Sequence, residues 1–312
     1  MIVNPNPQPM ATFQIGEREF ELQTKLGEGV SGKTYLYREQ SSGQLYTVKV
    51  IKLGFNRRLW DRTRTEIKIL ELLKRHCEQL AIPCFEVGLS LNYGDELHSV
   101  FGGTRSSGPI AVIMYQFAAG VTLFELTKSQ PVVWSTDVGL ISAFLSQLLS
   151  TIQVMHNENV VHRDIKTANI IYNDDSGRFT LIDFGLSCQQ VCSSVAGTPN
   201  YVLPVILRGE WDSSGGNSGE PTLNQFKQSD LYAIGVCAYH MITHSYPRKV
   251  TIVRDSSNRI IEYRLSDYVP LDSVLMPDYI IATVEDLLLH SDLGIDTIYQ
   301  RWLTANASSS RH

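Results

Sequence analysis

The sequence lacks the features that mark several large classes of protein. Its 312 residues include five cysteines, an odd number that does not suggest a disulfide framework. The net charge of −5 provides no general attraction to nucleic acid or to an anionic membrane. The first ten residues, MIVNPNPQPM, lack the basic region and apolar run of a secretory signal, and the most apolar stretch, 110–126, is too short to span a bilayer. We therefore expect a soluble, cytoplasmic or otherwise intracellular protein that neither spans a membrane nor binds nucleic acid.

The remaining composition is that of an ordinary globular chain. Hydrophobic residues make up 43% and charged residues 19% of the sequence, and its length allows one large domain or two modest ones. Residues 1–12 are rich in Asn and Pro, which predicts a flexible leader. Cys188 and Cys192 lie four residues apart and close to Asp183. Two interpretations of this pair stay open: reduced thiols, which we expect, or a redox switch.

The chain is organised around the stretch 160–185. This stretch contains His-Arg-Asp ending at Asp164, then Asn169, and then Asp-Phe-Gly beginning at Asp183. Two short apolar runs flank the turn residues 174–177, which predicts a β-hairpin between the two acidic positions. Such a hairpin can hold one carboxylate near a hydroxyl nucleophile and a second carboxylate, with an amide, on a divalent metal. These groups suit phosphoryl transfer, in which positioning and charge neutralisation supply most of the catalysis.

A glycine-rich segment, 27–34, satisfies two phosphate-binding motifs at once. It matches G-x-G-x-x-G through Gly27, Gly29 and Gly32, and it also matches the Walker A pattern G-x-x-x-x-G-K-T. A Walker A loop must be followed by a helix. The residues that follow are instead β-branched and aromatic on both sides of a Ser-Ser-Gly turn at 41–43, which predicts a hairpin. We therefore favour the first motif over a P-loop ATPase or GTPase.

The motifs of the central stretch, H-R-D-x-x-x-x-N and D-F-G, resemble those of the eukaryotic-type serine/threonine protein kinases, and the resemblance covers about residues 20–240. It implies an α+β, bilobal protein kinase-like fold, in which a small antiparallel β-sheet lobe with one key helix precedes a larger, mainly helical lobe. We place the small ATP-binding lobe at 13–117 and the large catalytic and substrate-binding lobe at 118–312, as one kinase domain over about 20–305. The implied activity is ATP-dependent phosphorylation of Ser or Thr hydroxyls on protein substrates.

By this resemblance, four residues carry out the transfer. Asp164 is the catalytic base that accepts or orients the proton of the substrate hydroxyl, and Lys166 steadies the γ-phosphate as in the serine/threonine branch. Lys49 matches the strand lysine that contacts the α- and β-phosphates. Glu66, seventeen residues later on a predicted helix at 57–77, matches the glutamate that pairs with this lysine.

The resemblance also assigns the groups that would bind ATP and its metal. Asn169 and Asp183 match the residues that hold Mg²⁺, with Mn²⁺ as an alternative. Met114 falls at the gatekeeper position, and Gln116 and Phe117 would offer backbone groups to adenine. The full set comes from the glycine loop, the strands above adenine, the hinge and the pocket floor: Leu26, Gly27, Gly29, Gly32, Thr34, Thr47, Lys49, Met114, Gln116, Phe117 and Ile171.

The segment after D-F-G contains further positions of interest. Ser193 and Ser194 are candidates for regulatory phosphorylation. Thr198, in Gly197-Thr198-Pro199, matches a structural threonine that hydrogen-bonds the catalytic Asp and Lys. Asp230 matches an aspartate that anchors the backbone of the catalytic loop.

The chain departs from the family late in the large lobe. Where the family has A-P-E, this sequence reads Leu203-Pro204-Val205, and no clear D-P-x-x-R follows that could supply the arginine partner of the glutamate. Losing both members of a buried ion pair can be nearly neutral, so we expect a remodelled lobe rather than an inactive enzyme. We expect the helices of residues 245–312 to offer a site for a regulatory partner.

Two alternatives from other functional classes stay open. A nucleotide-binding pseudokinase scaffold would be favoured by the loss of Lys49, Asp164 or Asp183, and all three are present. A small-molecule phosphotransferase on a related fold would share the catalytic and metal residues. Such enzymes usually lack the Gly197-Thr198-Pro199 segment, whose presence favours protein substrates.

Overall fold

The computed structural model describes residues 11–29, 32–92, 94–101, 108–129, 136–192, 195–210, 221–272 and 276–309. The chain divides into two compact units, unit 1 (residues 1–78 and 83–118) and unit 2 (residues 79–82 and 119–312). The change of unit after residue 118 falls one residue from the lobe boundary that the sequence suggests, whereas the sequence places 79–82 in the small lobe. The predicted leader lies largely outside the described residues, and its last residue, Thr12, begins the first strand.

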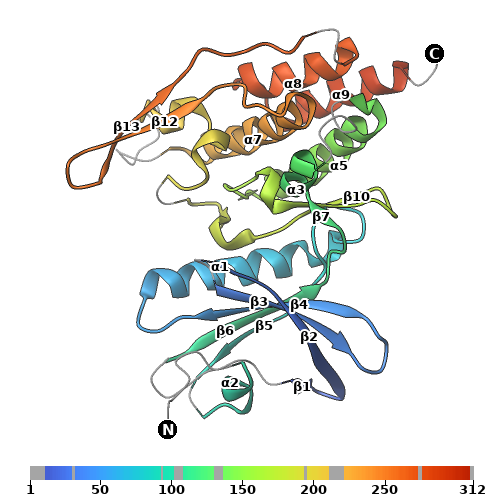
Figure 1. Cartoon of the computed structure of the whole chain (residues 1–312), viewed down its shortest axis with the longest axis vertical. Coiled ribbons are helices and arrows are strands. Elements are labelled where there is room, and N and C mark those ends of the chain that lie inside the picture. The colour runs from blue at the N-terminus through green and yellow to red at the C-terminus, as the bar shows by residue number, and fades with distance from the viewer. Residues whose placement is uncertain are drawn as a thin grey trace. The chain divides into compact units, whose positions relative to one another are not determined.

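Unit 1 is built on an antiparallel sheet with the strand order β1-β2-β3-β4-β6-β5 (Figure 1). The strands are β1 (Thr12–Ile15), β2 (Arg18–Gly29), β3 (Gly32–Glu39), β4 (Leu45–Lys52), β5 (Phe85–Leu91) and β6 (Ile110–Gln116). The turn between β1 and β2 contains Gly16 at φ +61°, a backbone conformation that glycine adopts without steric strain. Residues 12–29 therefore form a β-hairpin. The hairpin predicted after the glycine loop is confirmed as β3 and β4.

Aromatic side chains join the N-terminal hairpin to the core of unit 1. Phe13 on β1 stacks on Phe20, with ring centroids 4.9 Å apart, and contacts Tyr37 and Phe101 edge-on at 4.8 Å. Phe101 follows α2 (Glu96–Val100), a short helix. Such rings bury large apolar areas, so β1 and α2 belong to this hydrophobic core.

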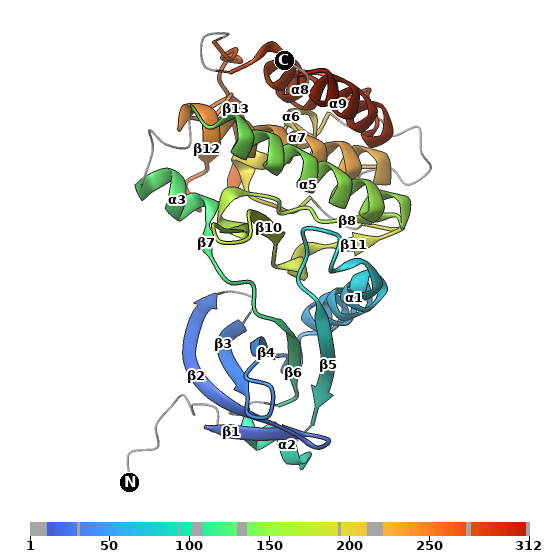
Figure 2. The ribbon, with the colours of Figure 1, turned by 90° about the vertical axis from the view of Figure 1, so that its right-hand side faces the viewer.

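Helix α1 (Arg57–Leu73) continues into the 3-10 turn η1 (Lys74–His76) and lies beside β5 (Figure 2). Together they confirm the helix predicted at 57–77. Asn56 begins α1, because its side chain accepts a hydrogen bond from the Leu59 N–H. The helix approaches β5 so closely that a Cβ at Gly88 would lie 2.7 Å from Ile67 Cγ2. This approach fixes the helix, and with it Glu66, against the sheet.

Unit 2 combines helices with small sheets. Its helices are α3 (Leu123–Ser129), α5 (Val138–Asn157), α6 (Pro204–Leu207), α7 (Leu223–Thr243), α8 (Asp278–Leu289) and α9 (Ile295–Ser309). Its 3-10 turns are η2 (Thr167–Asn169), η3 (Phe184–Leu186) and η4 (Pro199–Tyr201). The strands β7 (Val121–Thr122), β8 (Val160–Val161), β9 (Ile170–Asn173), β10 (Arg178–Leu181), β11 (Cys188–Gln189), β12 (Val250–Arg254) and β13 (Ile260–Leu265) form sheets of order β10-β9-β7, β11-β8 and β12-β13.

Helix α7 is the centre of unit 2. Almost all of its second half is buried, and α8 packs so closely on it that a Cβ at Gly235 would lie 2.9 Å from Leu287 Cβ. Helix α5 packs against both α7 and α9. The fully buried Trp302 on α9 donates its Nε1–H to Ser146 Oγ on α5 at 3.0 Å. Through these contacts α7, the helix that carries Asp230, lies at the centre of the helical packing of unit 2.

Helix α5 is also the one helix in the described part of the chain whose length and apolar composition would suffice to cross a membrane. Its apolar side chains, among them Phe144, Leu148 and Ile152, are fully buried inside unit 2. A core helix of a globular domain has the same length and composition. We therefore assign α5 to the core.

The segment 250–265 differs from its predicted structure. We expected helices from residue 245 onward, whereas β12 and β13 form an antiparallel hairpin before α8 and α9 begin. The pattern TIVR-DSSN-RIIEYRL contains β-branched runs around polar turn residues, which is a strand signal. The helical expectation was therefore wrong for this segment and right for 278–309.

The expectation of reduced thiols is also contradicted. Cys77 is bonded to Cys84, and Cys188 is bonded to Cys192, while Cys237 is free and buried in α7. Two cysteines can pair only where the backbone brings them together, and short sequence separation does not reveal that path. In both pairs a turn of the chain returns the second cysteine to the first.

Candidate active site

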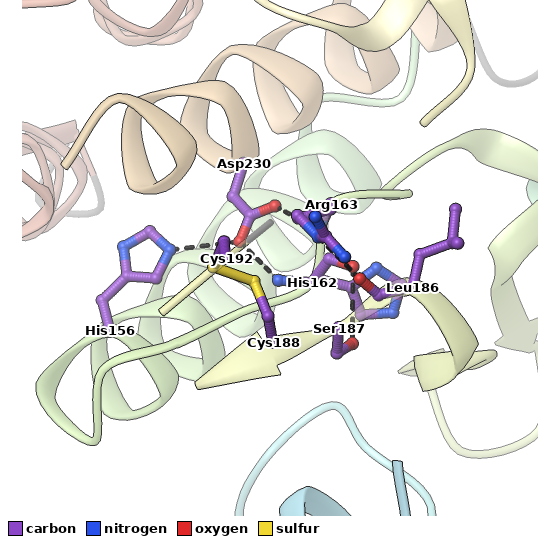
Figure 3. The surroundings of a disulfide bond; sticks show 8 residues. All are labelled: His156, His162, Arg163, Leu186, Ser187, Cys188, Cys192 and Asp230. Carbon is purple, nitrogen blue, oxygen red and sulfur yellow. Dashed lines mark hydrogen bonds and ion pairs between the residues drawn. A yellow bond between two sulfur atoms is a disulfide. The ribbon is translucent and has the colours of Figure 1, made fainter. Parts of the chain in front are cut away.

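The catalytic loop of unit 2 is held in place by Asp230 on α7. One carboxylate oxygen of Asp230 accepts the N–H of His162 at 2.8 Å, and the other accepts the N–H of Arg163 at 2.9 Å (Figure 3). Arg163 has φ +66°, a strained conformation for a residue with a side chain, and these bonds stabilise it. Its Nε–H also donates to Leu186 O at 2.6 Å. The expected anchoring of the loop by Asp230 is confirmed.

His156, which the sequence analysis did not single out, takes part in the same arrangement. Its Nε2 lies 3.2 Å from Asp230 Oδ2, and both side chains are almost fully buried. Desolvation penalises the charge of a buried carboxylate, so each additional hydrogen-bond partner stabilises it. The available sequence signal was weak: a histidine four residues after Ile152 on the buried face of α5.

Asp164 is surrounded by donors from three residues of unit 2. Its Oδ1 accepts from Thr198 Oγ1 at 2.8 Å, and its Oδ2 lies 2.6 Å from Lys166 Nζ and 3.0 Å from Asn169 Nδ2. Lys166 Nζ also donates to Thr198 Oγ1 at 3.1 Å. The sequence-predicted residues Asp164, Lys166 and Asn169 are thus brought together, and Thr198 joins them as expected. The carboxylate is fixed in orientation and 8% exposed.

The second acidic residue, Asp183, follows the predicted hairpin of β9 and β10. Leu181 on β10 pairs with Ile170 on β9, and the Ile182 N–H donates to Asn169 O at 2.8 Å. Asp183 has φ +63°, and its Oδ1 caps η3 by accepting the N–H of Gly185 at 3.4 Å. Asn169 and Asp183 therefore sit at the two ends of one hairpin.

The oxygen donors at this hairpin fit a magnesium ion. The Asn169 nitrogen donates to the backbone and side chain of Asp164, which directs the amide oxygen elsewhere, and Asp183 supplies a carboxylate. Within the described residues, no group of three or more His, Cys, Asp or Glu side chains could hold a metal alone. Mg²⁺ suits such a partial set, because it is usually held by one or two protein oxygens together with substrate phosphates.

His162 and Phe184 contact each other beneath these groups. Their rings meet edge to face at 4.9 Å, and the His162 Nδ1 accepts the N–H of Asp164 at 3.3 Å. Complete burial lowers the pKa of His162, so the ring is neutral. This arrangement indicates that both residues serve packing rather than chemistry.

In unit 1, Lys49 on β4 and Glu66 on α1 form a buried ion pair. The Lys49 Nζ lies 2.7 Å from Glu66 Oε1, and the two side chains are 7% and 4% exposed. Thr34 on β3 stands opposite Lys49 in the strand register. The structure thus brings together the lysine and glutamate that the sequence places seventeen residues apart.

The glycine-rich segment is a strand-to-strand connection. Gly29 at the end of β2 pairs with Gly32 at the start of β3, and β3 continues as a strand. A Walker A loop requires a helix at this point, so the structure excludes that alternative. Gly32 has φ +128°, and a Cβ there would lie 2.4 Å from Val50 O, whereas a Cβ at Gly27 or Gly29 would meet no atom within 4 Å. Packing within the chain therefore accounts for Gly32 but not for Gly27 and Gly29.

The remaining residues predicted near ATP lie in different surroundings. Thr47 and Met114 are buried in the sheet, and Leu26 is exposed. The N–H groups of Gln116 and Phe117 donate to Cys84 O and Leu45 O at 2.9 and 3.0 Å. These two N–H groups therefore have partners within the chain, and the assignment of adenine contacts to Gln116 and Phe117 stays a prediction. Ile171 lies on β9 in unit 2.

The A-P-E position also has a distinct local structure. Leu203 precedes α6, which begins with Pro204 and Val205, and the Leu203 N–H donates to Ser229 Oγ at 3.1 Å. Arg301, an arginine late in the chain, pairs with Asp286 at 3.0 Å. Ser193 and Ser194 lie outside the described residues, and their phosphorylation stays a prediction.

Comparison with known proteins gives a consistent result. Residues 20–273 match the family described as "Protein kinase domain". The chain is 26% identical over 280 residues to "Ribosomal protein S6 kinase alpha-6" of Danio rerio, which covers 86% of this chain and 32% of that protein. It is 24% identical over 259 residues to "Serine/threonine-protein kinase Nek6" of Oryza sativa subsp. japonica, covering 82% of this chain and 42% of that protein. The chain therefore spans less than half the length of these two relatives.

A solved structure is similar in fold. The Cydia pomonella granulovirus kinase PK-1 superposes with a TM-score of 0.62 over 90% of this chain and 93% of the viral chain, at 18% sequence identity. At this identity the likeness concerns the fold, which confirms the protein kinase architecture predicted from the sequence.

Proposed function

Because this chain belongs to the eukaryotic-type serine/threonine protein kinase family, we propose that it transfers the γ-phosphoryl group of ATP to serine or threonine hydroxyls of protein substrates. One observation carries this proposal above the others. Asp164 is oriented by Thr198, Lys166 and Asn169 at 2.6–3.0 Å, next to the hairpin that ends in Asp183. A kinase needs a fixed carboxylate beside its metal-binding residues to position the attacking hydroxyl.

We assign the proton-handling role to Asp164. Its carboxylate would accept a hydrogen bond from the substrate hydroxyl and take up the proton as transfer proceeds. Lys166, which already contacts both Asp164 and Thr198, would place its ammonium group near the transferring phosphate. The bond from Thr198 orients the carboxylate, which a general base requires.

Asn169 and Asp183 are the residues that would hold Mg²⁺, with Mn²⁺ as an alternative. When bound, the metal neutralises negative charge on the phosphates of ATP. In unit 1, Lys49 would contact the α- and β-phosphates, and its ion pair with Glu66 would hold it in position. The glycine loop would place backbone N–H groups near the phosphates. The open space at Gly27 and Gly29 is consistent with close approach of a ligand there.

A protein substrate is favoured over a small molecule by the segment 197–199. Gly197 lies so close to the catalytic loop that a Cβ would be 2.5 Å from Arg163 O, and Thr198 contacts Asp164 directly. A peptide could therefore lie along this segment with its hydroxyl near the carboxylate. We expect the protein to act inside the cell, where ATP and magnesium are abundant. A regulatory partner at the C-terminal part of unit 2 stays a prediction.

The test is transfer of labelled phosphate from γ-labelled ATP, with magnesium, to a generic basic protein. We expect label on Ser or Thr with the wild-type chain and loss of label with Asp164→Ala and with Asp183→Ala. Asp286→Asn is the matched control, because it removes a surface carboxylate whose ion pair with Arg301 contributes little to stability. No transfer by a wild-type chain that ATP still protects against heat would instead favour the pseudokinase scaffold.

A further inference from the structure

We propose that a groove between α6 and β13 of unit 2 binds an extended, apolar segment of the protein substrate that flanks the acceptor hydroxyl. This inference rests on the proposed function, because it extends the contact of the substrate beyond the segment 197–199. It names the kind of sequence that the groove selects. The argument depends on the edge of β13, on the side chains that line the groove, and on its distance from Thr198.

The α6–β13 groove has a volume of about 580 Å³ and is lined by Val195, residues 206–210 and residues 260–263. Sites that bind ligands typically have volumes of about 300–1,000 Å³. Successive side chains of a strand point to opposite faces of its sheet. Four consecutive lining residues therefore place the groove along the edge of β13 rather than over one face of the hairpin (Figure 1). A ligand in the groove would lie beside the backbone of β13.

The edge of β13 presents backbone groups that pairing with β12 does not use. The Ser266 N–H donates to Lys249 O at 2.9 Å, so these two residues form a hydrogen-bonded pair. Such pairs alternate along an antiparallel ladder, so Tyr263, opposite Ile252, turns its N–H and C=O away from β12. Among the bonds of the described residues, none outside the hairpin involves these two groups. Ile261 is the unpaired residue of a bulge in the same strand. An extended peptide can pair with an edge of this kind as an added strand.

The wall opposite β13 is fixed by its own hydrogen bonds. Residues 208–210 donate their N–H groups to carbonyl oxygens of α6 at 2.9–3.2 Å. The wall therefore keeps its shape without a ligand, and a peptide that enters the groove does not have to order it. A preformed wall reduces the entropy that binding costs.

The apolar side chains of the groove are unusually exposed. Ile260 and Ile261 are 43% and 63% exposed, and Val195 on the other side is 42% exposed. Single exposed apolar residues are common on protein surfaces, whereas several that line one groove mark a contact site. Burying these side chains against apolar side chains of a peptide would stabilise the complex.

The charged side chains of the groove already have partners. Arg208 Nε lies 3.0 Å from Glu210 Oε2. On β13, Arg264 Nη2 lies 2.9 Å from Glu262 Oε2. No excess charge of either sign is thus available to attract an acidic or a basic peptide. The groove therefore favours apolar side chains in the substrate over charged ones.

The groove is also close to the proposed position of the acceptor hydroxyl. Val195 precedes Thr198 by three residues, so their Cα atoms are at most about 11 Å apart. Thr198 Oγ1 donates to Asp164 Oδ1 at 2.8 Å. An extended peptide advances about 3.3 Å per residue, so it covers this distance in about four residues. One peptide can therefore present its hydroxyl to Asp164 and its flanking side chains to the groove.

The hairpin itself provides a matched control. Ile252 on β12 is 39% exposed and is not among the residues that line the groove. Ile252→Glu adds a carboxylate to the hairpin outside the groove, whereas Ile261→Glu adds the same carboxylate inside it. Both replaced side chains are exposed, so we expect both variants to fold.

The experiment measures the binding of fluorescein-labelled peptides to the full chain by fluorescence anisotropy. Each peptide has a central serine. In the test peptide, valines occupy alternate positions that begin about four residues from the serine on both sides, and in the matched peptide glutamines replace them. We expect the wild-type chain to bind the valine peptide about tenfold or more tightly than the glutamine peptide, because burial of one aliphatic side chain contributes a factor of this size.

The variants locate this preference. Ile261→Glu should weaken binding of the valine peptide about tenfold and raise its KM by a similar factor with kcat unchanged, and Ile252→Glu should change neither. Hydrogen exchange of the amides of residues 261–263 in the wild type should slow when the valine peptide is bound, because an added strand protects them.

The outcomes separate this inference from the proposed function. Selective binding of the valine peptide without phosphoryl transfer would overturn the function and support the groove. Equal affinity for the two peptides, or equal weakening by Ile252→Glu and Ile261→Glu, would overturn the groove and leave transfer as a separate result. A dimer in sedimentation velocity that Ile261→Glu dissociates would assign the groove to a second copy of the chain and overturn the inference. A thermal melt identifies a variant that does not fold, and the two-peptide comparison and the exchange of the wild type then decide.

Discussion

Unit 1 and unit 2 position their charged site residues in opposite ways. In unit 1, Lys49 and Glu66 form a compact ion pair, both almost fully buried, between a strand and a helix. In unit 2, Asp164 is oriented by several donors around it, and the loop that carries it is held separately by Asp230. The first arrangement places two opposite charges in direct contact. The second separates the group that we propose to react, Asp164, from Asp230, which supports the backbone.

This difference predicts how each unit responds to substitution. Removing Lys49 or Glu66 leaves the other charge buried without that counter-charge, so the free energy of unfolding should fall. Removing Asp164 leaves the loop anchored through Asp230, so activity should be lost while the fold persists. Substitutions that test this contrast range from a large effect on rate to a small effect on pH dependence.

The largest expected effect is that of Asp164→Asn on phosphoryl transfer. The amide keeps the size of the side chain but cannot accept the hydroxyl proton, so kcat should fall about 10²- to 10⁴-fold. The thermal midpoint should stay close to that of the wild type, because the anchor at Asp230 is intact. Single-turnover transfer and a melt on the same sample check both statements. A melt lowered as much as by a core substitution would mean that Asp164 also supports the loop.

Glu66→Ala should destabilise unit 1 strongly. Lys49 would lose the carboxylate at 2.7 Å, and breaking such a buried pair costs about 3–5 kcal/mol. Replacing both residues, as Lys49→Met/Glu66→Leu, should recover much of that stability while leaving transfer inactive. Urea unfolding of the three variants measures the difference. Equal loss in the single and double variants would show that position in unit 1 does not rest on the pair.

Asp230→Asn should have an intermediate effect. The amide nitrogen would face a backbone N–H or His156 where an oxygen now accepts, and one unsatisfied buried donor costs about 1–3 kcal/mol. Arg163 would be less firmly held at φ +66°, so transfer should fall together with stability. Parallel losses in urea unfolding and in kcat would distinguish this supporting role from that of Asp164.

Much of this site could be predicted from the sequence because its geometry is local. Asp164, Lys166 and Asn169 lie within six residues of one another. The hairpin that leads to Asp183 is predicted by two apolar runs with turn residues between them. The pairing of Lys49 with Glu66 spans a longer separation, yet one strand and one helix set their spacing. For these residues, the structure predicted from the local sequence pattern is the one that the tertiary contacts require.

The features that were missed depend on contacts distant in sequence or on weak patterns. His156 meets Asp230 across 74 residues, and nothing in its neighbourhood distinguishes it from other residues on the buried face of α5. The bonds of Gln116 and Phe117 to Cys84 and Leu45 depend on sheet register, which the sequence does not display. The β12–β13 hairpin had a usable strand signal that the expectation of helices overrode.

The smallest expected effect is on the pH dependence of stability. It tests His162, which packs next to Asp164, and does not involve phosphoryl transfer. Burial lowers the pKa of His162 in the folded chain below its ordinary value near 6.5. His162 in the unfolded chain therefore takes up a proton as the pH falls below about 6.5, whereas the buried ring of the folded chain stays neutral to lower pH. The free energy of unfolding declines from about pH 6.5 down through the folded pKa.

His162→Phe keeps a ring against Phe184 and should flatten this decline between about pH 6.5 and 5, relative to the wild type. Urea midpoints across that range measure it. An unchanged slope would assign the acid sensitivity to other groups, such as His240, whose pKa burial also lowers, and would show that the loop tolerates a charged His162.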